Sequence, residues 1–156
     1  MFVHDFVYVD IPAAAVRARI LAEHGSWMNP LANGATAEGD ALRVRIGPTT
    51  KITPLSRITD VELGQPFDRG DTTVVPMTWN GVGTSSAFPV LHADMEIASL
   101  GKDRSQLSLL GRYEPPLGGI GRRLDQLLLH RIAEASVRSF LRRLAAALSE
   151  TVAAVQ

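Results

Sequence analysis

The sequence predicts an α+β domain in which one antiparallel sheet packs against one long helix. Three observations support this fold class: an N-terminal strand-like segment followed by strong helix formers, then five short apolar segments between turn residues, and finally a long C-terminal stretch without a helix breaker. At 156 residues, the chain is long enough to bury roughly two-thirds of the surface that its unfolded form exposes. We therefore expect residues 1–156 to form a single domain.

The N-terminal residues are predicted to form one strand and short helices. Residues 2–11 (FVHDFVYVDI) are rich in aromatic and β-branched side chains, which favour strands. Residues 13–25 switch to strong helix formers and end at Gly25, which we interpret as the residue that caps the helix. In residues 26–34, Pro30 and an Asn-Gly pair limit any second helix to a short turn.

The middle of the chain has the pattern of an antiparallel meander, because its apolar segments follow one another without a helix between them. These segments are residues 41–46, 53–63, 71–79, 91–99 and 105–113. Ile58 and Val61 fall on opposite faces of the second segment, so we expect a bulge or bend there. Pro76 in the third segment indicates an edge position or a kink. With the first strand included, the sheet should have about six strands.

Alternation with a period of two assigns one face of each regular strand to the core. The residues predicted to point inward are Leu42, Val44, Ile46, Thr73, Val75, Met77, Trp79, Ala93, Met95, Ile97, Leu107, Leu109 and Tyr113. None of these side chains is charged at neutral pH, whereas the opposite faces hold ionisable residues such as His92 and Asp94. We therefore expect His92 and Asp94 to be substantially exposed.

Residues 119–149 are predicted to form one long helix. Its apolar residues make two stripes that lie nearly opposite each other at about 100° per residue. The first stripe is Ile120, Leu124, Leu127 and Leu128, and the second is Leu129, Ala133, Val137, Phe140, Leu144 and Leu148. The first half of the helix should therefore contact something besides the sheet, either residues 12–34 or a partner chain. Glu134 and Arg138, on a charged face, have the spacing of a helical ion pair.

Composition argues against several classes of function. The chain has no cysteine, so it can form no disulfide, thiolate metal site or cysteine nucleophile. Its 16 Lys and Arg balance 16 Asp and Glu, which argues against nucleic-acid binding. No window reaches the roughly 18 consecutive apolar residues of a membrane span, and the N-terminus lacks the features of a signal peptide. We expect a cytoplasmic protein that is not an integral membrane protein.

The motifs that could hold a nucleotide, a metal or an acid-base pair are incomplete, so no cofactor is predicted. The glycines in residues 118–121 match neither the Rossmann fingerprint nor the P-loop, and we interpret them as a turn. His130 and Glu134 have the i,i+4 spacing of a metal-binding pair but lack a third ligand. His92 and Asp94 are interpreted as a solvated pair. No catalytic residue is identified.

Two stretches carry a resemblance to a known superfamily: residues 75–101 (VPMTWNGVGTSSAFPVLHADMEIASLG) and residues 109–148 (LLGRYEPPLGGIGRRLDQLLLHRIAEASVRSFLRRLAAAL). The most specific part is the Tyr-x-Pro-Pro-x-Gly turn into the long helix. The chain resembles the SRPBCC superfamily of START- or Bet v 1-like helix-grip proteins, which includes polyketide cyclase/dehydrase-like members. The resemblance implies a curved antiparallel sheet wrapped around the C-terminal helix, with a deep, mostly apolar cavity between them. The chain has one strand fewer than the plant-allergen type.

The resemblance also implies that inward-facing residues line a ligand cavity. The residues expected to contact the ligand are Trp27, Met77, Trp79, Met95, Leu107, Leu109, Tyr113, Leu124 and Leu128. The Tyr113 hydroxyl, the Trp79 indole N–H and Thr73 are the inward polar groups, and they suit an apolar ligand with one or two polar handles. The same residues also suit an ordinary hydrophobic core.

Three functions follow as hypotheses. The leading one is a protein that binds a hydrophobic small-molecule ligand, either lipid-like or aromatic and polyketide-like. The second is a cyclase/aromatase-type enzyme, which needs an inward acid or base that the strand pattern does not supply. The third is a protein-interaction module that uses the rim of the domain or the first half of the long helix. The sequence leaves open the identity of the ligand and whether the chain forms a homodimer.

Overall fold

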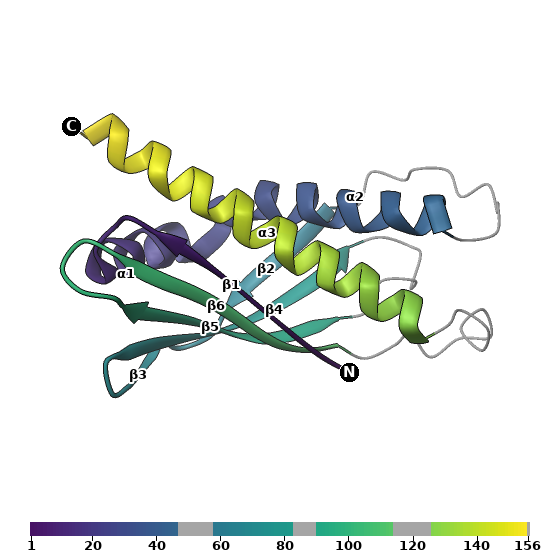
Figure 1. Cartoon of the computed structure of the whole chain (residues 1–156), viewed down its shortest axis with the longest axis horizontal. Coiled ribbons are helices and arrows are strands. Elements are labelled where there is room, and N and C mark those ends of the chain that lie inside the picture. The colour runs from purple at the N-terminus through teal and green to yellow at the C-terminus, as the bar shows by residue number, and fades with distance from the viewer. Residues whose placement is uncertain (47–57, 83–89, 114–125, 156) are drawn as a thin grey trace.

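The computed structural model describes residues 1–46, 58–82, 90–113 and 126–155. Its elements are β1 (Phe2–Val9), α1 (Ala13–Leu21), the 3-10 segment η1 (Ala22–Met28), α2 (Asn29–Ile46), β2 (Ile58–Leu63), β3 (Phe67–Arg69), β4 (Thr72–Val82), β5 (Leu91–Ser99), β6 (Ser105–Tyr113) and α3 (Gln126–Val155). One antiparallel sheet forms a layer, and α3 lies diagonally across its inner face with α2 beside it (Figure 1). The predicted helix-grip α+β fold is confirmed.

The sheet is six-stranded, with the order β1-β6-β5-β4-β2, and β3 pairs with the beginning of β4. Its register sets which side chains lie at the same level. Leu91 of β5 pairs with Trp79 of β4 and with Tyr113 of β6. At the other end of β5, Ile97 pairs with Thr73 of β4. The inner face of the sheet therefore presents different side chains at its two ends.

The hydrophobic core lies between this inner face and α3. The buried side chains of β4, β5 and β6 in the core are Val75, Met77, Trp79, Leu91, Ala93, Met95, Ile97, Leu107, Leu109 and Tyr113, and those of α3 are Val137, Phe140, Leu141, Leu144 and Leu148. On the outer face of β5, His92 is exposed and Asp94 is half-buried. Most of the inward positions predicted for these three strands are buried, but Val74 and Ser108, at outward positions, are buried as well. The expectation that Asp94 would be substantially exposed is wrong.

Helix α2 corrects the prediction for residues 41–46, which form the end of a helix and not a strand. The apolar alternation there is only one short run, and short apolar runs do not discriminate between a strand and a buried helix. The backbone positions of Leu42, Val44 and Ile46 consequently lie outside the sheet.

The predicted stop of the helix near residue 34 is also wrong, because α2 continues from Asn29 to Ile46. Pro30 lies in the first helical turn, where its missing N–H needs no partner. Gly34 lies inside α2 where the helix meets α3. A Cβ atom at Gly34 would come within 2.6 Å of Arg143 Nη1, so the glycine permits the close approach of that side chain.

The sixth strand is β3, which the sequence did not reveal. Its three residues, Phe67–Arg69, are exposed, so they carry no alternation of apolar and polar side chains. The chain reverses after β3 at Gly70, whose φ of 61° suits a glycine. The number of strands therefore agrees with the prediction although one predicted strand is a helix.

Strand β2 pairs with β4 without interruption from Ile58 opposite Val82 to Leu63 opposite Met77. The bulge expected in residues 53–63 is thus absent from residues 58–63, and residues 53–57 lie outside the described part of the chain. Pro76 lies between the part of β4 that pairs with β3 and the part that pairs with β2. Neither β3 nor β2 pairs with Pro76, so its nitrogen, which has no hydrogen, is not required to donate a ladder hydrogen bond on that side of β4. This agrees with the edge position that Pro76 predicted.

Helix α3 has neighbours on two sides. It packs on the sheet and also along α2, whose first residues belong to the predicted 12–34 segment. The helix ends at Val155, beyond the predicted residue 149, and residues 119–125 lie outside the described part. Leu127, in the first stripe, is 68% exposed.

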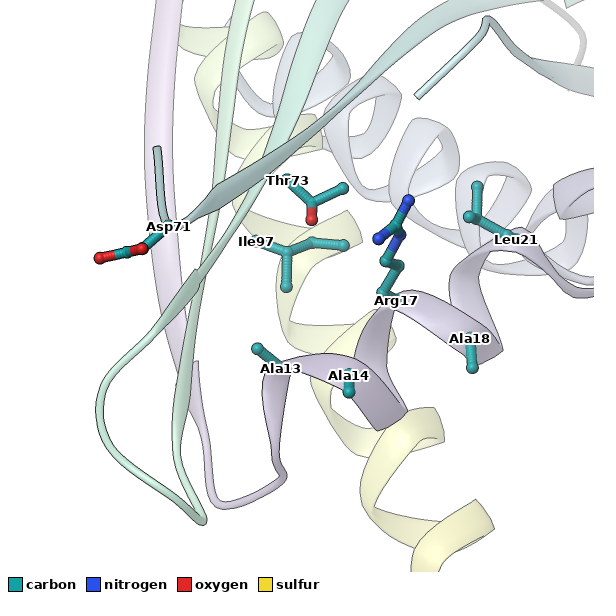
Figure 2. A pocket seen from close by; sticks show the side chains of 8 residues that line it. All are labelled: Ala13, Ala14, Arg17, Ala18, Leu21, Asp71, Thr73 and Ile97. Atoms are coloured by element: carbon teal, nitrogen blue, oxygen red, sulfur yellow. The ribbon is translucent and has the colours of Figure 1, made fainter. Parts of the chain in front are cut away.

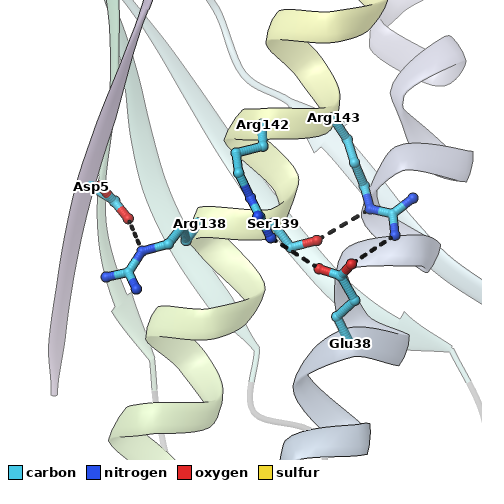
Figure 3. A network of polar contacts seen from close by, with 6 residues as sticks. All are labelled: Asp5, Glu38, Arg138, Ser139, Arg142 and Arg143. Carbon is cyan, nitrogen blue, oxygen red and sulfur yellow. Dashed lines mark hydrogen bonds and ion pairs between the residues drawn. The ribbon is translucent and has the colours of Figure 1, made fainter.

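Ion pairs connect α3 to β1 on one side and to α2 on the other (Figure 3). Arg138 Nε donates to Asp5 Oδ2 of β1 at 3.1 Å, while Arg142 and Arg143 pair with Glu38 of α2 at 3.4 and 3.3 Å. The Ser139 hydroxyl and then the two arginines hold the pKa of Glu38 below its ordinary value against the effect of burial. Exposed pairs of this kind each contribute about 0–1 kcal/mol.

Segment η1 contains three successive residues with left-handed backbone: Glu23, His24 and Gly25, with φ of 54°, 55° and 80°. Helix α1 ends before them, and its capping residue is Ala22, whose N–H bonds to the Arg19 carbonyl. Gly25 is therefore not the cap that we predicted, but it has the positive φ for which glycine is suited.

Replacing Gly25 with alanine should destabilise the fold more than the same change at Gly70. Both residues have positive φ, which costs alanine about 1–2 kcal/mol. At Gly25 the new Cβ would also lie 2.5 Å from Leu63 Cδ1, whereas nothing lies within 4 Å at Gly70. We expect the overlap to add about 1–3 kcal/mol. Urea denaturation of both variants measures the difference, and equal losses would contradict the packing of η1 on β2.

Candidate ligand-binding site

The candidate site lies at the end of the inner face where β4 and β6 end and β5 begins. The register places Trp79, Leu91 and Tyr113 side by side on three neighbouring strands. All three side chains are buried, with Trp79 at 5% and Tyr113 at 1% exposure. The wall of this site is therefore apolar, with one indole N–H and one phenol hydroxyl as its polar groups.

The indole nitrogen of Trp79 is a buried donor without a hydrogen-bond partner among the described residues. The Trp79 ring packs against Phe140 of α3, with 5.2 Å between ring centroids. An unsatisfied buried donor costs about 1–3 kcal/mol, so such a group calls for an explanation. One explanation is an acceptor that arrives with a ligand.

A chain of three polar side chains starts at Tyr113. The Tyr113 hydroxyl lies 3.4 Å from His130 Nδ1, and His130 Nε2 lies 3.2 Å from Glu134 Oε1. The Tyr113 and His130 rings are stacked at 6.4 Å, and the hydroxyl also contacts the Met1 sulfur. The Tyr113 hydroxyl has one proton, which it donates either to the Met1 sulfur or, when His130 is neutral with its own proton on Nε2, to His130 Nδ1.

Burial raises the pKa of Tyr113, and the negative charge of Glu134 raises it further. Both effects favour the neutral phenol because they disfavour a buried anion near a carboxylate. Tyr113 is consequently a hydrogen-bond donor at neutral pH. The arrangement can donate a proton from the phenol and accept one at His130, whose side chain is 36% exposed.

The other predicted ligand residues have different positions. Met77, Met95, Leu107 and Leu109 lie on the inner face and belong to the core that α3 covers. Trp27 of η1 is half-buried beneath the Arg19 guanidinium, 4.1 Å from the ring centroid. Leu124 lies outside the described residues. Leu128 is on α3, but its side chain is not described.

The geometry corrects the placement of Thr73 and gives His130 a partner that the sequence did not indicate. Thr73 was grouped with Trp79 and Tyr113 as a polar handle, but it lies at the other end of β4, where its hydroxyl donates to Asp68 at 2.9 Å. His130 and Glu134 were considered as a metal pair, yet His130 meets Tyr113. No sequence pattern indicates that contact, because it depends on how α3 crosses β6. Within the described residues, no three His, Cys, Asp or Glu side chains converge as metal ligands would.

The long C-terminal helix gripped by the antiparallel sheet defines the class of protein, a helix-grip protein. None of the described helices is long and apolar enough to cross a membrane. No protein-family model matches the chain, and no curated protein does.

Solved structures do match. A conserved protein from Geobacillus kaustophilus is 12% identical over 95% of this chain and 95% of that chain, with a TM-score of 0.54. The Zhui aromatase/cyclase from Streptomyces sp. R1128 is 15% identical over 97% and 95%, with a TM-score of 0.49. Ara h 8.0201 is 8% identical over 96% and 98%, with a TM-score of 0.42. The match to the Geobacillus protein shows a shared fold, in agreement with the helix-grip fold that the resemblance to the SRPBCC superfamily implied.

The Tyr113 phenol should titrate above its ordinary pKa, and Glu134→Gln should lower that pKa because it removes one of the two causes. The unfolded chain ionises first, so this group contributes stability below about pH 10 that is lost as the pH rises through the folded-state value. Tyrosinate absorbance during alkaline titration measures the pKa, and Tyr113→Phe identifies the signal. Glu150→Gln, further along α3, is the control. A titration that Glu134→Gln leaves unchanged would contradict the proximity of the two groups.

Proposed function

We propose that this protein binds a hydrophobic small molecule, lipid-like or aromatic, between the end of the sheet and α3. The observation that carries this proposal is the buried Trp79 N–H, which has no acceptor among the described residues. A ligand oxygen, such as that of a carbonyl, ether or phenol, would supply the missing acceptor. The neutral Tyr113 phenol, at the same level of the sheet, would be a second donor when its single proton turns from Met1 or His130 to the ligand.

The chemistry of the wall supports an uncharged ligand body. The inward side chains of β4, β5 and β6 include no ionised group, and burial of an unpaired charge there would cost several kcal/mol. The ionisable groups nearby, His130 and Glu134, are paired with each other and partly exposed. We therefore place the apolar body of the ligand against the sheet and its oxygen at Trp79 and Tyr113.

The Phe140 ring occupies the space next to the Trp79 indole. Its ring is fully buried and packs on Trp79, so a ligand that reaches the indole must displace or share this space. An aromatic or similarly flat ligand would pack on the Trp79 ring in place of Phe140 and so restore the contact between rings that it displaces. Flat ligands with an acceptor oxygen are thus favoured over branched aliphatic ones.

Trp79→Phe should weaken binding of Nile red, a flat apolar dye with a carbonyl acceptor, by about two- to tenfold, the effect of one neutral hydrogen bond. The free energy of unfolding should fall by about 1–2 kcal/mol, because the smaller ring leaves a cavity in the core and the removal of an unsatisfied donor offsets only part of that loss. Dye fluorescence gives the affinity and urea denaturation the stability. Phe6→Leu, on the exposed outer face of β1, is the control. Unchanged dye affinity in folded Trp79→Phe would refute this site.

The Tyr113, His130 and Glu134 chain favours a second candidate function, a cyclase/aromatase-type enzyme. His130 Nδ1 would take a proton from the carbon next to a ligand carbonyl, while Tyr113 would donate to the carbonyl oxygen. His130 and Tyr113 then restore each other by proton transfer over their 3.4 Å contact. Glu134 holds the imidazole in the tautomer that this role needs.

Exchange of the α-protons of 2-tetralone in D2O tests this candidate by NMR. We expect the protein to accelerate exchange and His130→Gln to reduce the acceleration by about 100-fold or more, a usual effect of general acid-base catalysis. His92→Gln, on the outer face of β5, should leave the rate unchanged. Exchange no faster than in buffer would rule out proton transfer to this probe and leave binding as the function.

A further inference from the structure

A hollow lies at the opposite end of the sheet from Trp79 and Tyr113. Its volume is about 510 Å³, which falls within the usual range for small-molecule sites of roughly 300–1,000 Å³. It opens between α1 and the strands β4 and β5 (Figure 2). Its lining residues are Ala13, Ala14, Arg17, Ala18, Leu21, Asp71, Thr73 and Ile97. The proposed function uses none of them.

The two sites are separated along β4. Thr73 of the hollow and Trp79 of the first site are six positions apart on the same strand. At the rise of a strand this corresponds to about 20 Å. A small molecule in the hollow would therefore not reach Trp79.

The walls of the hollow are mostly apolar and small. Ala13 of α1 points toward Ile97 of β5, whereas Ala14 and Ala18 are exposed and point away from the strands (Figure 2). The α1 residues that line the hollow include three alanines, whose short side chains leave space beside the strands. Such a space suits a slender apolar group.

Beside the hollow, the Asp68 carboxylate accepts a hydrogen bond from one lining residue, Thr73, and lies within ion-pair distance of another, Arg17. Asp68 of β3 accepts a hydrogen bond from the Thr73 hydroxyl at its Oδ1 atom, at 2.9 Å. The same oxygen lies 4.0 Å from Arg17 Nη1. Within the described residues Arg17 has no closer ion pair, and its side chain is 43% exposed. At the position of this Asp68 oxygen, an anion can accept a hydrogen bond from Thr73 and lie close to the Arg17 guanidinium.

The charges around the hollow favour an acid over an amine. Arg17 points its guanidinium into the hollow, whereas the Asp71 carboxylate points away from it (Figure 2). A cationic ligand would meet Arg17, while an anionic one would meet both the guanidinium and the Thr73 hydroxyl. Asp68 itself is easily released, because its side chain is 60% exposed and would be solvated after leaving.

We propose that this hollow binds a small apolar carboxylic acid, whose carboxylate replaces that of Asp68 at Thr73 and Arg17. The hydrocarbon part of the acid lies beside α1 and against Ile97. Asp68 is an internal competitor that occupies the anion position while the hollow is empty. Binding at this hollow is independent of the ligand at the first site.

The test uses octanoate labelled with carbon-13 at its carboxyl, titrated by NMR into the full chain. Arg17→Gln should weaken octanoate binding about tenfold, the effect of one charge-assisted contact. Asp68→Asn should tighten it about three- to tenfold, because the competing carboxylate is removed. Arg17→Lys, which keeps the charge, should fall between Arg17→Gln and the parent. Opposite effects of Arg17→Gln and Asp68→Asn are the signature of the proposal.

Matched controls separate this proposal from simpler explanations. Asp71→Asn removes the same charge as Asp68→Asn, but the Asp71 side chain points away, so octanoate affinity should change much less (Figure 2). Trp79→Phe should leave octanoate binding unchanged. The proposal is overturned if octanoate does not bind, if Asp71→Asn tightens binding as much as Asp68→Asn, or if Trp79→Phe weakens it while Arg17→Gln does not.

Discussion

The packing of α3 onto the inner face of the sheet is the interaction on which the rest of the structure depends. Phe140, Leu141 and Leu144 bury their side chains completely or nearly so in the core, and the Phe140 ring packs on Trp79 of β4. Burial of each such side chain is worth about 1.5–3 kcal/mol, more than the exposed ion pairs at the flanks of the helix provide. Those pairs, from Arg138 to Asp5 and from α3 to Glu38, define where the helix lies between β1 and α2.

The position of α3 also decides what the two ends of the sheet can do. At one end the helix brings Phe140 onto Trp79 and His130 onto Tyr113, so aromatic surface and polar donors meet in one place. At the other end, α1 presents Ala13 and Arg17 to the strands and leaves a hollow. One sheet register therefore carries both proposed sites, an apolar one beside Trp79 and Tyr113 and one with Arg17 at its edge.

Much of the sheet could be predicted from its sequence because β4, β5 and β6 are half-buried strands. In such strands the inward positions are apolar because they face the core, so the alternation in β4, β5 and β6 predicts which side chains are buried. The same alternation placed Trp79 and Tyr113 on the inner face. The prediction failed at residues 41–46, where a short run has no such constraint, and at β3, whose exposed residues bury nothing.

The sequence by itself determined the fold class, the faces of three strands and the apolar character of the inner wall, because these follow from periodicity along the chain. The tertiary structure alone decided that His130 contacts Tyr113, that the Trp79 N–H lacks an acceptor among the described residues, and that Asp68 lies between Thr73 and Arg17. These features depend on contacts that α1 or α3 makes with strands far from it along the chain. Such contacts depend on the angle at which helices cross the sheet, and local sequence periodicity carries no information about that angle.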